Sequence, residues 1–414
     1  MKKCVIIGGG VIGLCTAYYL QKEGHEVMII DQSSMDAGAS YVNAGYISPS
    51  HIVPLSAPGV IKKGIAWMLD PASPFYVKPR LNSDFLRWAW AFNKSCTKAH
   101  VNASMQVIRD ISVFSHELYQ NITKEKGFDF HFEKKGLLML CKTEKMLEEE
   151  IHVAEMAGKV DLEASVLDKK QLKNLEPHVE VDAIGATFYS CDAHSTPHEF
   201  MSNMKRYLLA NGVEISSNEE VLDIEIRNKK ITEVKSAKRT IKGDEFVLAA
   251  GSWTHLVAKK LGKNLLLQAG KGYRININRE TGIKYPAILA EAKVAVTPMH
   301  GFTRFAGTME INEINNDINP VRVEAIAKAA TSYYPDVSVQ KEEMQHASSG
   351  LRPLSPDGLP YIGRTEKCSN LVIATGHAMM GWTMATGTGI MVAEIISGSK
   401  PSIDLTPFSP DRKF

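Results

Sequence analysis

Apolar and polar positions at the start of the chain predict two strands around a helix. Residues 3–7 are apolar and predict a strand, residues 8–13 form a glycine-rich turn, and residues 14–22 have helical spacing. A second apolar strand over residues 25–30 ends immediately before Asp31. Because a strand, a crossover helix and a second strand form a βαβ unit, we expect a parallel sheet here.

The periodicity changes several times along the rest of the chain. Residues 44–100 are loop-rich, and residues 105–175 are helical and charged, with TEKMLEEEIHVAEMAGK as the clearest amphipathic helix. Strands are predicted in GATFYS, VEISS, VLDIEIRN, ITEVKS and EFVLAAG, with a helix in HEFMSNMKRYLLANG. LLLQAGKGYRININ and VAVTPMHGFTRFAGTMEI then predict a second, antiparallel sheet, and residues 371–397 close with a strand and a glycine-rich helix.

Composition limits the class of protein and of partner. The chain has 414 residues, 44% of them apolar, which is enough for two domains. Its 48 basic residues barely exceed its 46 acidic ones, so we expect no nucleic-acid partner. The six cysteines form no CxxC pair and no His/Cys cluster at zinc spacing, so we expect free thiols, a reducing compartment and no metal site. No apolar stretch reaches the roughly 20 residues of a spanning helix, and we expect a cytoplasmic protein without a signal peptide.

The glycine turn carries the GxGxxG pattern of a dinucleotide-binding unit, as Gly8, Gly10 and Gly13. Gly8 permits the turn, Gly10 lets a pyrophosphate approach the backbone, and Gly13 lets the helix pack closely on the strand. Asp31, at the end of the next strand, is placed to accept ribose hydroxyls. The alternatives are a turn without a ligand and a solvated carboxylate, but the strand, turn, helix and acid together favour a dinucleotide.

Three later segments indicate which dinucleotide is bound. SYVNAGYISPS, VLAAGSW and TGHAMMGWTMATGTG combine small residues with polar ones, and each allows a close approach of the backbone. Taken singly, each is as well explained by a tight turn. Three such segments far apart in the sequence fit one long cofactor, FAD, better than a nicotinamide nucleotide.

A single arginine stands in a rigid segment near the end of the chain. SSGLRPLSPDGLPYIG places Arg352 directly before a proline, which favours an extended backbone at that arginine. A planar guanidinium held in this way can bind a carboxylate through two parallel hydrogen bonds. A surface ion pair is the alternative.

These segments together resemble the D-amino acid oxidase superfamily of flavoproteins, and within it the bacterial D-amino acid dehydrogenases. The resemblance covers nearly the whole chain and rests on GGGVIGLCTAYYLQKEGHEVMIID, NAGYISPSHIVPLSAPGVIKKGIAWML, the KGY at residues 271–273, GLRPLSPDGLPYIGRT and TGHAMMGWTMATGTG. It implies an α/β plus α+β fold, in which a Rossmann-like FAD-binding domain is interwoven with an antiparallel-sheet substrate domain. We expect residues 1–50, 145–260 and 355–414 in the FAD-binding domain, and 51–144 and 261–354 in the substrate domain.

The resemblance also implies a reaction. Arg352 would hold the substrate carboxylate while hydride passes from Cα to flavin N5, and water would convert the imino acid to a 2-oxo acid and ammonia. Tyr273 and Lys271 are further catalytic candidates on one face of a strand, against the alternatives of a core tyrosine and a solvated lysine. His51 and His377 are candidate bases, for which a structural role is the alternative. The expected FAD-binding residues are Gly8, Gly9, Gly10, Val11, Ile12, Gly13, Asp31, Gln32, Ser40, Asn43, Ala44, Gly45, Val221, Ala250, Gly251, Trp253, Gly376, His377, Met380, Gly381, Trp382 and Thr383.

The motifs do not identify the electron acceptor or the amino acid that is oxidised. A quinone-dependent dehydrogenase, an oxygen-using D-amino acid or glycine oxidase and a D-hydroxyproline dehydrogenase share these motifs. Trp67, Trp88 and Trp90 lie among basic residues within 60–92, a pattern that favours peripheral contact with the inner face of the cell membrane and hence a quinone. Packing of these tryptophans on the substrate domain is the alternative, and a non-catalytic flavin-binding protein is the alternative from another class.

Overall fold

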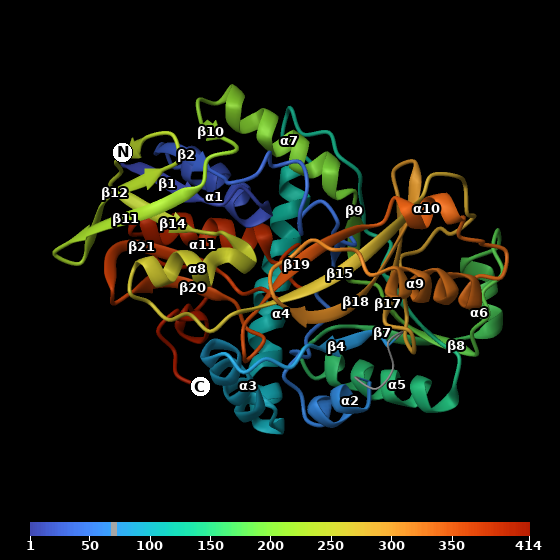
Figure 1. Ribbon diagram of the computed structural model, residues 1–414. Helices are drawn as coiled ribbons and strands as arrows, with labels where there is room; N and C mark the ends of the chain where they lie inside the picture. Colours follow the sequence, from blue (N-terminus) through green and yellow to red (C-terminus); the bar gives the residue numbers. More distant parts are fainter. Residues whose placement is uncertain (68–72) are drawn as a thin grey trace.

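The computed structural model of the chain describes residues 1–67 and 73–414, apart from the side chains of Lys63, Ala66 and Trp67. Its first sheet, at the left of Figure 1, has six strands in the described residues, in the order β10, β2, β1, β14, β21 and β20. Their bounds are β1 (Lys3–Ile7), β2 (Glu26–Ile30), β10 (Glu214–Ser216), β14 (Glu245–Leu248), β20 (Tyr361–Thr365) and β21 (Cys368–Thr375). All pairs are parallel except β20 with β21. The expected N-terminal βαβ unit is confirmed, with α1 (Val11–Lys22) as its helix.

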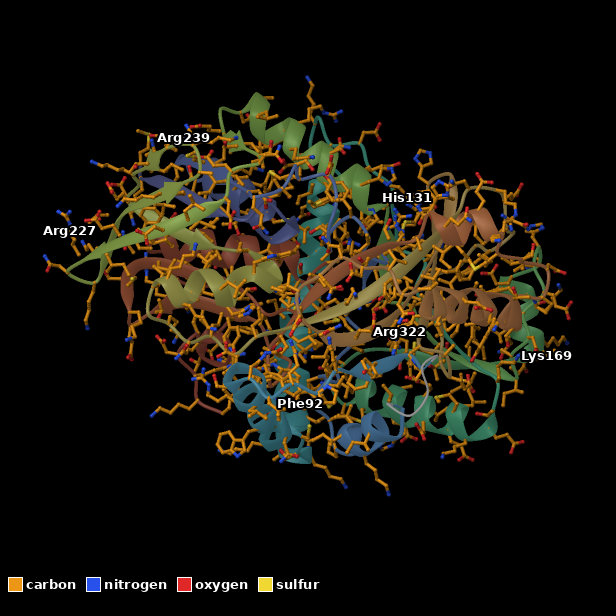
Figure 2. The ribbon with its side chains drawn as sticks, in the orientation of Figure 1. Phe92, His131, Lys169, Arg227, Arg239 and Arg322 are labelled. Atoms are coloured by element: carbon orange, nitrogen blue, oxygen red, sulfur yellow. The ribbon has the colours of Figure 1, made fainter. Side chains whose placement is uncertain are left out.

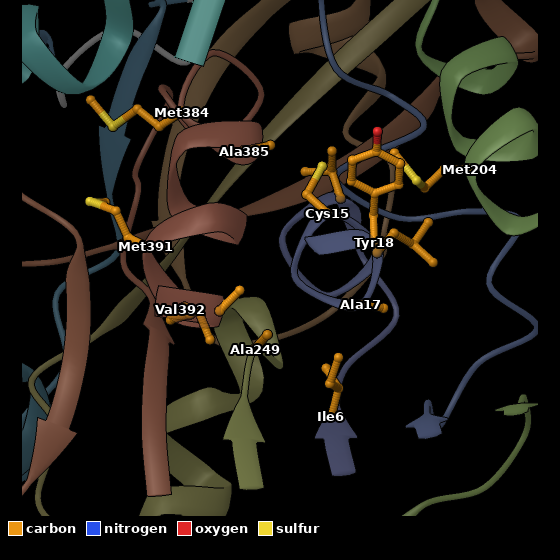
Figure 3. Close-up of a cluster of buried hydrophobic side chains, with 14 of the residues drawn as sticks. Ile6, Cys15, Ala17, Tyr18, Met204, Ala249, Met384, Ala385, Met391 and Val392 are labelled. Atoms are coloured by element: carbon orange, nitrogen blue, oxygen red, sulfur yellow. The ribbon is translucent and has the colours of Figure 1, made fainter. Parts of the chain in front are cut away.

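Both faces of this sheet are buried, which explains why its strands are almost entirely apolar. In β1, Cys4 and Ile6 face a core formed with α1, α4 (Lys98–Ile122), α7 (Pro197–Ala210) and α11 (Ala385–Ser397). Figure 3 shows part of this core, where Ile6 and Ala249 lie near side chains of α1 and α11. Val5 and Ile7 face the opposite core, which is covered by β11 (Val221–Arg227), β12 (Lys230–Ser236), β13 (Thr240–Ile241) and α8 (Thr254–Lys260).

A second sheet, at the right of Figure 1, contains nine strands of the described chain and is mostly antiparallel. Its order is β19, β15, β18, β17, β16, β6, β8 and β7, with β4 paired to β18. The bounds are β4 (Phe75–Val77), β6 (Leu137–Cys141), β7 (Ala164–Asp168), β8 (Gly185–Tyr189), β15 (Gln268–Ile277), β16 (Ala287–Leu289), β17 (Val294–Met299), β18 (Phe302–Asn312) and β19 (Ser348–Leu354). Tyr273, Ile275 and Ile277 of β15 pack against α9 (Pro320–Tyr333) on one face. The other helices beside this sheet are α5 (Glu144–Gly158), α6 (Lys169–Leu175) and α10 (Lys341–Gln345).

Smaller elements complete the fold. A three-stranded sheet joins β3 (Tyr46–Ile47), β9 (Ala193–Ser195) and β5 (Phe132–Glu133). Helices α2 (Val60–Trp67) and α3 (Ser83–Ser95) lie at the bottom of Figure 1, within the segment that the sequence predicts to be loop-rich. Two single-turn helices cover Gly251–Trp253 and Thr406–Phe408. Among the described helices, none combines the length and apolar character that crossing a lipid bilayer requires.

The two sheets divide the chain differently from the expected domain boundaries. Strands β7 and β8 join the nine-stranded sheet, although residues 145–260 were expected to lie with the dinucleotide-binding part. Helix α4 packs on α11 beside the six-stranded sheet, although 51–144 was expected in the substrate domain. The helical prediction over 105–175 missed β6 and β7, because short apolar runs between helices have no periodicity of their own.

Candidate active site

A cavity of about 1020 Å³ lies between the two sheets and is lined by most of the candidate residues. Residues from the glycine turn, the 31–51 segment, β15, β18, β19 and the start of the last helical region line its walls. The cavity therefore joins the segments that the sequence predicts to bind one long cofactor. Its lining includes Gly8, Gly9, Gly10, Val11, Ile12, Asp31, Gln32, Ser40, Asn43, Ala44, Val221, Ala250, Gly251, Trp253, His377, Met380, Gly381, Trp382, Thr383, Tyr273 and Arg352.

The glycine turn places the N-terminus of α1 at the cavity. Gly8 has φ +112°, and a Cβ there would lie 2.4 Å from the Ala249 carbonyl oxygen. A Cβ on Gly13 would lie 1.9 Å from the Gly8 carbonyl oxygen, so Gly13 allows the helix to touch the turn, as predicted. A Cβ on Gly10 would have one protein atom within 4 Å, the Ser40 Oγ at 3.3 Å. The helix N-terminus thus presents bare backbone and a positive dipole end to the cavity, which suits a pyrophosphate.

Asp31 follows β2 and holds the turn from the other side. Its Oδ2 accepts the Gly9 N–H at 2.6 Å, and its Oδ1 accepts the backbone N–H and the hydroxyl of Ser33. The carboxylate thereby fixes the glycine turn while lining the cavity. Its predicted contact with a ribose remains a prediction.

The segment around Asn43 is fixed by its own side chain and by a buried arginine. Asn43 Oδ1 accepts the Gly45 N–H at 2.8 Å, which closes a tight turn. Arg304 in β18 donates from Nη1 to the carbonyls of Tyr41 and Asn43, at 2.9 and 2.6 Å. Gly45 is not among the described residues that line the cavity. A glycine is needed at this position because φ is +78° and because a Cβ would lie 2.2 Å from the Ser195 carbonyl oxygen.

The closing segment packs on the strand that carries Arg352. Ala378 N–H donates to the Pro353 carbonyl at 2.9 Å, and Leu354 forms a β-bridge with His377. His377 lines the cavity, and its Nε2 lies 2.9 Å from the Thr388 Oγ1. Gly376 lies outside the described cavity lining and adopts φ +81° in the turn before His377.

Arg352 lies in β19, as the extended backbone before Pro353 predicts, and its guanidinium lines the cavity. Its Nη1 donates to the Thr308 carbonyl at 2.9 Å. No ion pair joins Arg352 to a carboxylate within residues 1–67 and 73–414, so the surface ion pair is not found. Burial lowers the pKa of Arg352 to about 10, and the group therefore keeps its charge at neutral pH.

Two features of the neighbouring strands position this guanidinium. A Cβ on Gly272 of β15 would lie 2.1 Å from Arg352 Nη1, so the missing side chain makes room for the charge. Thr308 in β18 has φ +71°, at an irregularity in the pairing with β15 between Lys271 and Tyr273. Strained backbone of this kind is common at functional sites. The strained residue is Thr308 itself, whose carbonyl accepts the hydrogen bond from Arg352.

Tyr273 and Lys271 share one side of β15, as predicted, but they have different surroundings. Tyr273 lines the cavity, is buried, and donates its hydroxyl to Glu310, whose carboxylate lies 3.1 Å from Arg322 Nε. Figure 2 labels Arg322 beside the second sheet. Lys271 lies outside the described lining, and its Nζ donates to Asn315 Oδ1 and the Asp317 carbonyl at 2.6 and 2.8 Å. Lys271 therefore fixes the loop before α9 and does not reach solvent.

The two histidines proposed as bases are both uncharged at neutral pH. Burial lowers the pKa of His377 to about 3. Burial, with a smaller effect from Lys293, lowers the pKa of His51 to about 4. A neutral imidazole can still accept a proton, but these low values make each ring a weak base.

Comparison with known families gives the class of the protein. A family model described as FAD dependent oxidoreductase matches residues 3–395. The chain belongs to the FAD-dependent oxidoreductase family. It is 30% identical to a D-amino acid dehydrogenase of Granulibacter bethesdensis, over 97% of each chain. It is 31% identical to a D-amino acid dehydrogenase of Helicobacter pylori, over 95% of this chain and 94% of that one.

Solved structures of two other enzymes have the same fold as this FAD-dependent oxidoreductase. A glycine oxidase from Bacillus cereus superposes with a TM-score of 0.78 at 22% identity, covering 100% of this chain and 99% of that one. An L-proline dehydrogenase from P. horikoshii has a TM-score of 0.74 at 20% identity, covering 99% and 96%. The predicted fold class and the FAD cofactor are confirmed.

The cavity of this FAD-dependent oxidoreductase fits the cofactor of its family. Gly10 leaves the helix N-terminus open for a pyrophosphate, and the cavity continues from there to Arg352, whose cation has no carboxylate partner among the described residues. The sequence reasoning missed Gly272 and Thr308. Gly272 had a signal, because a glycine inside a strand marks a close approach. Thr308 had none, since threonine seldom adopts a positive φ.

Proposed function

We propose that this FAD-dependent oxidoreductase is a D-amino acid dehydrogenase, which converts D-amino acids to 2-oxo acids and ammonia. The observation that carries the proposal is the partly buried guanidinium of Arg352, which lines the cavity without a carboxylate partner in the described chain. A cation removed from much of its water in this way is costly unless a ligand compensates it. The carboxylate of an amino acid supplies that compensation through two parallel hydrogen bonds. The names of the curated relatives support the substrate class.

In this proposal FAD supplies the acceptor for the hydride that leaves Cα. The glycine turn, Asp31 and the closing segment would hold FAD, and Arg352 would orient the substrate. Tyr273 closes the wall of the cavity near Gly272, and its hydroxyl is already donated to Glu310. Hydride transfer removes no proton from Cα, so the weakly basic His51 and His377 are not required as bases at that carbon, and the ammonium group of the substrate would lose its proton to water before the transfer.

The test is an anaerobic reduction of the flavin with a panel of D- and L-amino acids. We expect bleaching with D-amino acids, and a loss of roughly 30-fold to several thousand-fold in substrate capture for Arg352→Ala, since losing one partner of a buried charge pair costs about 2 to 5 kcal/mol. Arg352→Lys keeps the charge but loses the planar fork, so we expect an intermediate loss.

Arg227 provides a matched control, because it lies on the exposed β11–β12 hairpin at the left of Figure 2. Arg227→Ala should behave like the wild type. Dithionite reduction and FAD content should be normal in all three variants. If Arg352→Ala is reduced by a D-amino acid at the wild-type rate and affinity, the proposed placement of the substrate is wrong. If L-amino acids alone reduce the wild type, the stereochemistry is wrong while the role of Arg352 stands.

For the electron acceptor we propose a quinone, reached through peripheral contact of the 60–92 segment with the inner face of the cell membrane. Large apolar side chains on and beside α2 and α3 are exposed to solvent: Ile65 (62%), Leu81 (96%), Leu86 (50%) and Trp90 (61%). Lys62 and Arg87 are exposed in the same segment. Apolar and basic groups side by side suit an anionic lipid surface. The 60–92 segment has two tryptophans besides Trp90. Trp88 is buried and donates its indole N–H to the Leu354 carbonyl, and the Trp67 side chain is not described by the structure.

Sedimentation with anionic vesicles tests the contact, together with a comparison of quinone-analogue reduction and oxygen consumption. We expect wild-type protein to sediment, and a Leu86→Asp/Trp90→Asp variant to lose most of that binding. Leu209→Asp is the control, because Leu209 is equally exposed on α7. Rapid peroxide formation without vesicle binding would instead identify an oxygen-using oxidase.

A further inference from the structure

Two histidines and a glutamate meet at the small sheet of β5, β9 and β3, outside the described cavity lining. Glu133 of β5 lies directly opposite His194 of β9 in the strand pairing, and His131 precedes β5. Figure 2 labels His131 between the two parts of the fold. The ligand atoms of the three side chains all lie within 4.8 Å of one another.

The distances from Glu133 to the two histidines are close to those between the ligands of a tetrahedral metal site. Glu133 Oε2 lies 3.4 Å from His194 Nε2 and 3.6 Å from His131 Nε2. Zinc binds histidine nitrogen and carboxylate oxygen at about 2.0–2.2 Å, so tetrahedral ligands are roughly 3.3 Å apart. Two histidines and one carboxylate are a common ligand set of zinc, with water in the fourth position.

His194 gives independent support for a ligand. Its side chain is 0% exposed, and neither ring nitrogen has a well-aligned hydrogen-bond partner in the described chain. The Pro298 carbonyl is the backbone group that interacts with the imidazole ring. A buried imidazole whose two nitrogens both lack well-aligned partners is unusual, because buried polar atoms are nearly always paired.

His131 is oriented as metal-binding histidines usually are. Its Nδ1 lies 2.9 Å from Thr196 Oγ1, which leaves Nε2 directed at Glu133. The competing partner of the carboxylate is Lys135, whose Nζ lies 2.7 Å from Glu133 Oε2. This ion pair is partly exposed and therefore contributes little.

We propose that His131, Glu133 and His194 bind one divalent transition-metal ion of the zinc class. The site adjoins the cavity wall, because Ser195, the neighbour of His194, donates its N–H to the Gly45 carbonyl and accepts the indole N–H of Trp382. A bound ion would join β5 to β9 and thereby stiffen this wall. The sequence spacing gave no sign of the site, since residues 131–133 and 194 meet only through the strand pairing.

The test is a calorimetric titration of chelator-treated, FAD-loaded protein with zinc chloride, supported by the visible spectrum with cobalt. We expect one equivalent to bind, and the affinity to fall about 100-fold or more in His131→Ala and Glu133→Gln, since even outer partners of metal ligands are worth 10- to 100-fold. Lys135→Met should bind more tightly, because the competing cation is removed. His131 and Glu133 are partly exposed, so these variants should fold.

The control is His152→Ala, because His152 and Glu155 form an exposed histidine–glutamate pair on α5 that is not part of the proposed site. That variant should bind zinc as the wild type does. Overturning results are a wild type that binds no stoichiometric zinc, or zinc affinity equal in the wild type, His131→Ala and Glu133→Gln. His194→Gln, provided that it retains normal FAD content, should also lose the site, and undiminished binding there would exclude His194 as a ligand.

Discussion

The glycines of the dinucleotide-binding turn lack side chains for different physical reasons. At Gly8 and Gly13 a side chain would collide with backbone atoms. At Gly10 a side chain would instead enter the space that a pyrophosphate would occupy. The sequence pattern predicted the role of Gly13, because its contact with the Gly8 carbonyl lies within one short turn, whereas the contact of Gly8 with Ala249 joins distant parts of the chain. Lys271 was harder to place, since its partners Asn315 and Asp317 lie in a loop far along the chain.

This division predicts opposite defects for two substitutions in one turn. Gly10→Val should fold normally but bind FAD at least about tenfold more weakly, a cost of roughly 1.4 kcal/mol or more, because its side chain enters the cavity. Gly13→Val should lose stability, since even a Cβ would overlap the Gly8 carbonyl. Flavin absorbance per protein and the thermal unfolding midpoint measure the two effects. Full FAD content in a folded Gly10→Val protein would contradict the assignment of the turn.

At the scale of elements, three adjacent strands build the site of Arg352. β19 carries the arginine, β15 leaves space at Gly272, and β18 provides the Thr308 carbonyl. The sequence predicted these strands and the extended backbone at Arg352 from local periodicity and proline. It could not predict the pairing irregularity at Lys271 and Tyr273, because register depends on contacts between distant strands.

Gly272→Ala tests how the strands cooperate. The new Cβ would lie 2.1 Å from Arg352 Nη1, so the guanidinium must move. We expect substrate capture to fall roughly 5- to 150-fold, as overpacking costs about 1–3 kcal/mol. FAD content should not change. Gly158→Ala in α5 is the control, since a Cβ there meets nothing within 4 Å. Equal kinetics for both variants would show that the guanidinium does not depend on this space.

At the scale of the whole molecule, FAD would bridge the two sheets, because its cavity is lined from both. A ligand that binds the folded state alone raises stability, by about 2.7 kcal/mol at 100 times its dissociation constant. We therefore expect removal of FAD to lower the unfolding midpoint and its return to restore it. In Gly10→Val the midpoint should respond far less to added FAD. Calorimetry at several FAD concentrations measures this, and a midpoint independent of FAD would argue against binding between the sheets.

The pairing of β1 with β14 has a consequence for biosynthesis. Cys4 lies opposite Glu245, and β21, which flanks β14 on its other side, begins at Cys368. A ribosome adds about 5–20 residues per second, so β14 follows β1 only after roughly tens of seconds. During that time its apolar faces and open edge invite aggregation. Residues 377–383 line the same cavity as the glycine turn, so we expect the complete flavin site to form only near the end of translation.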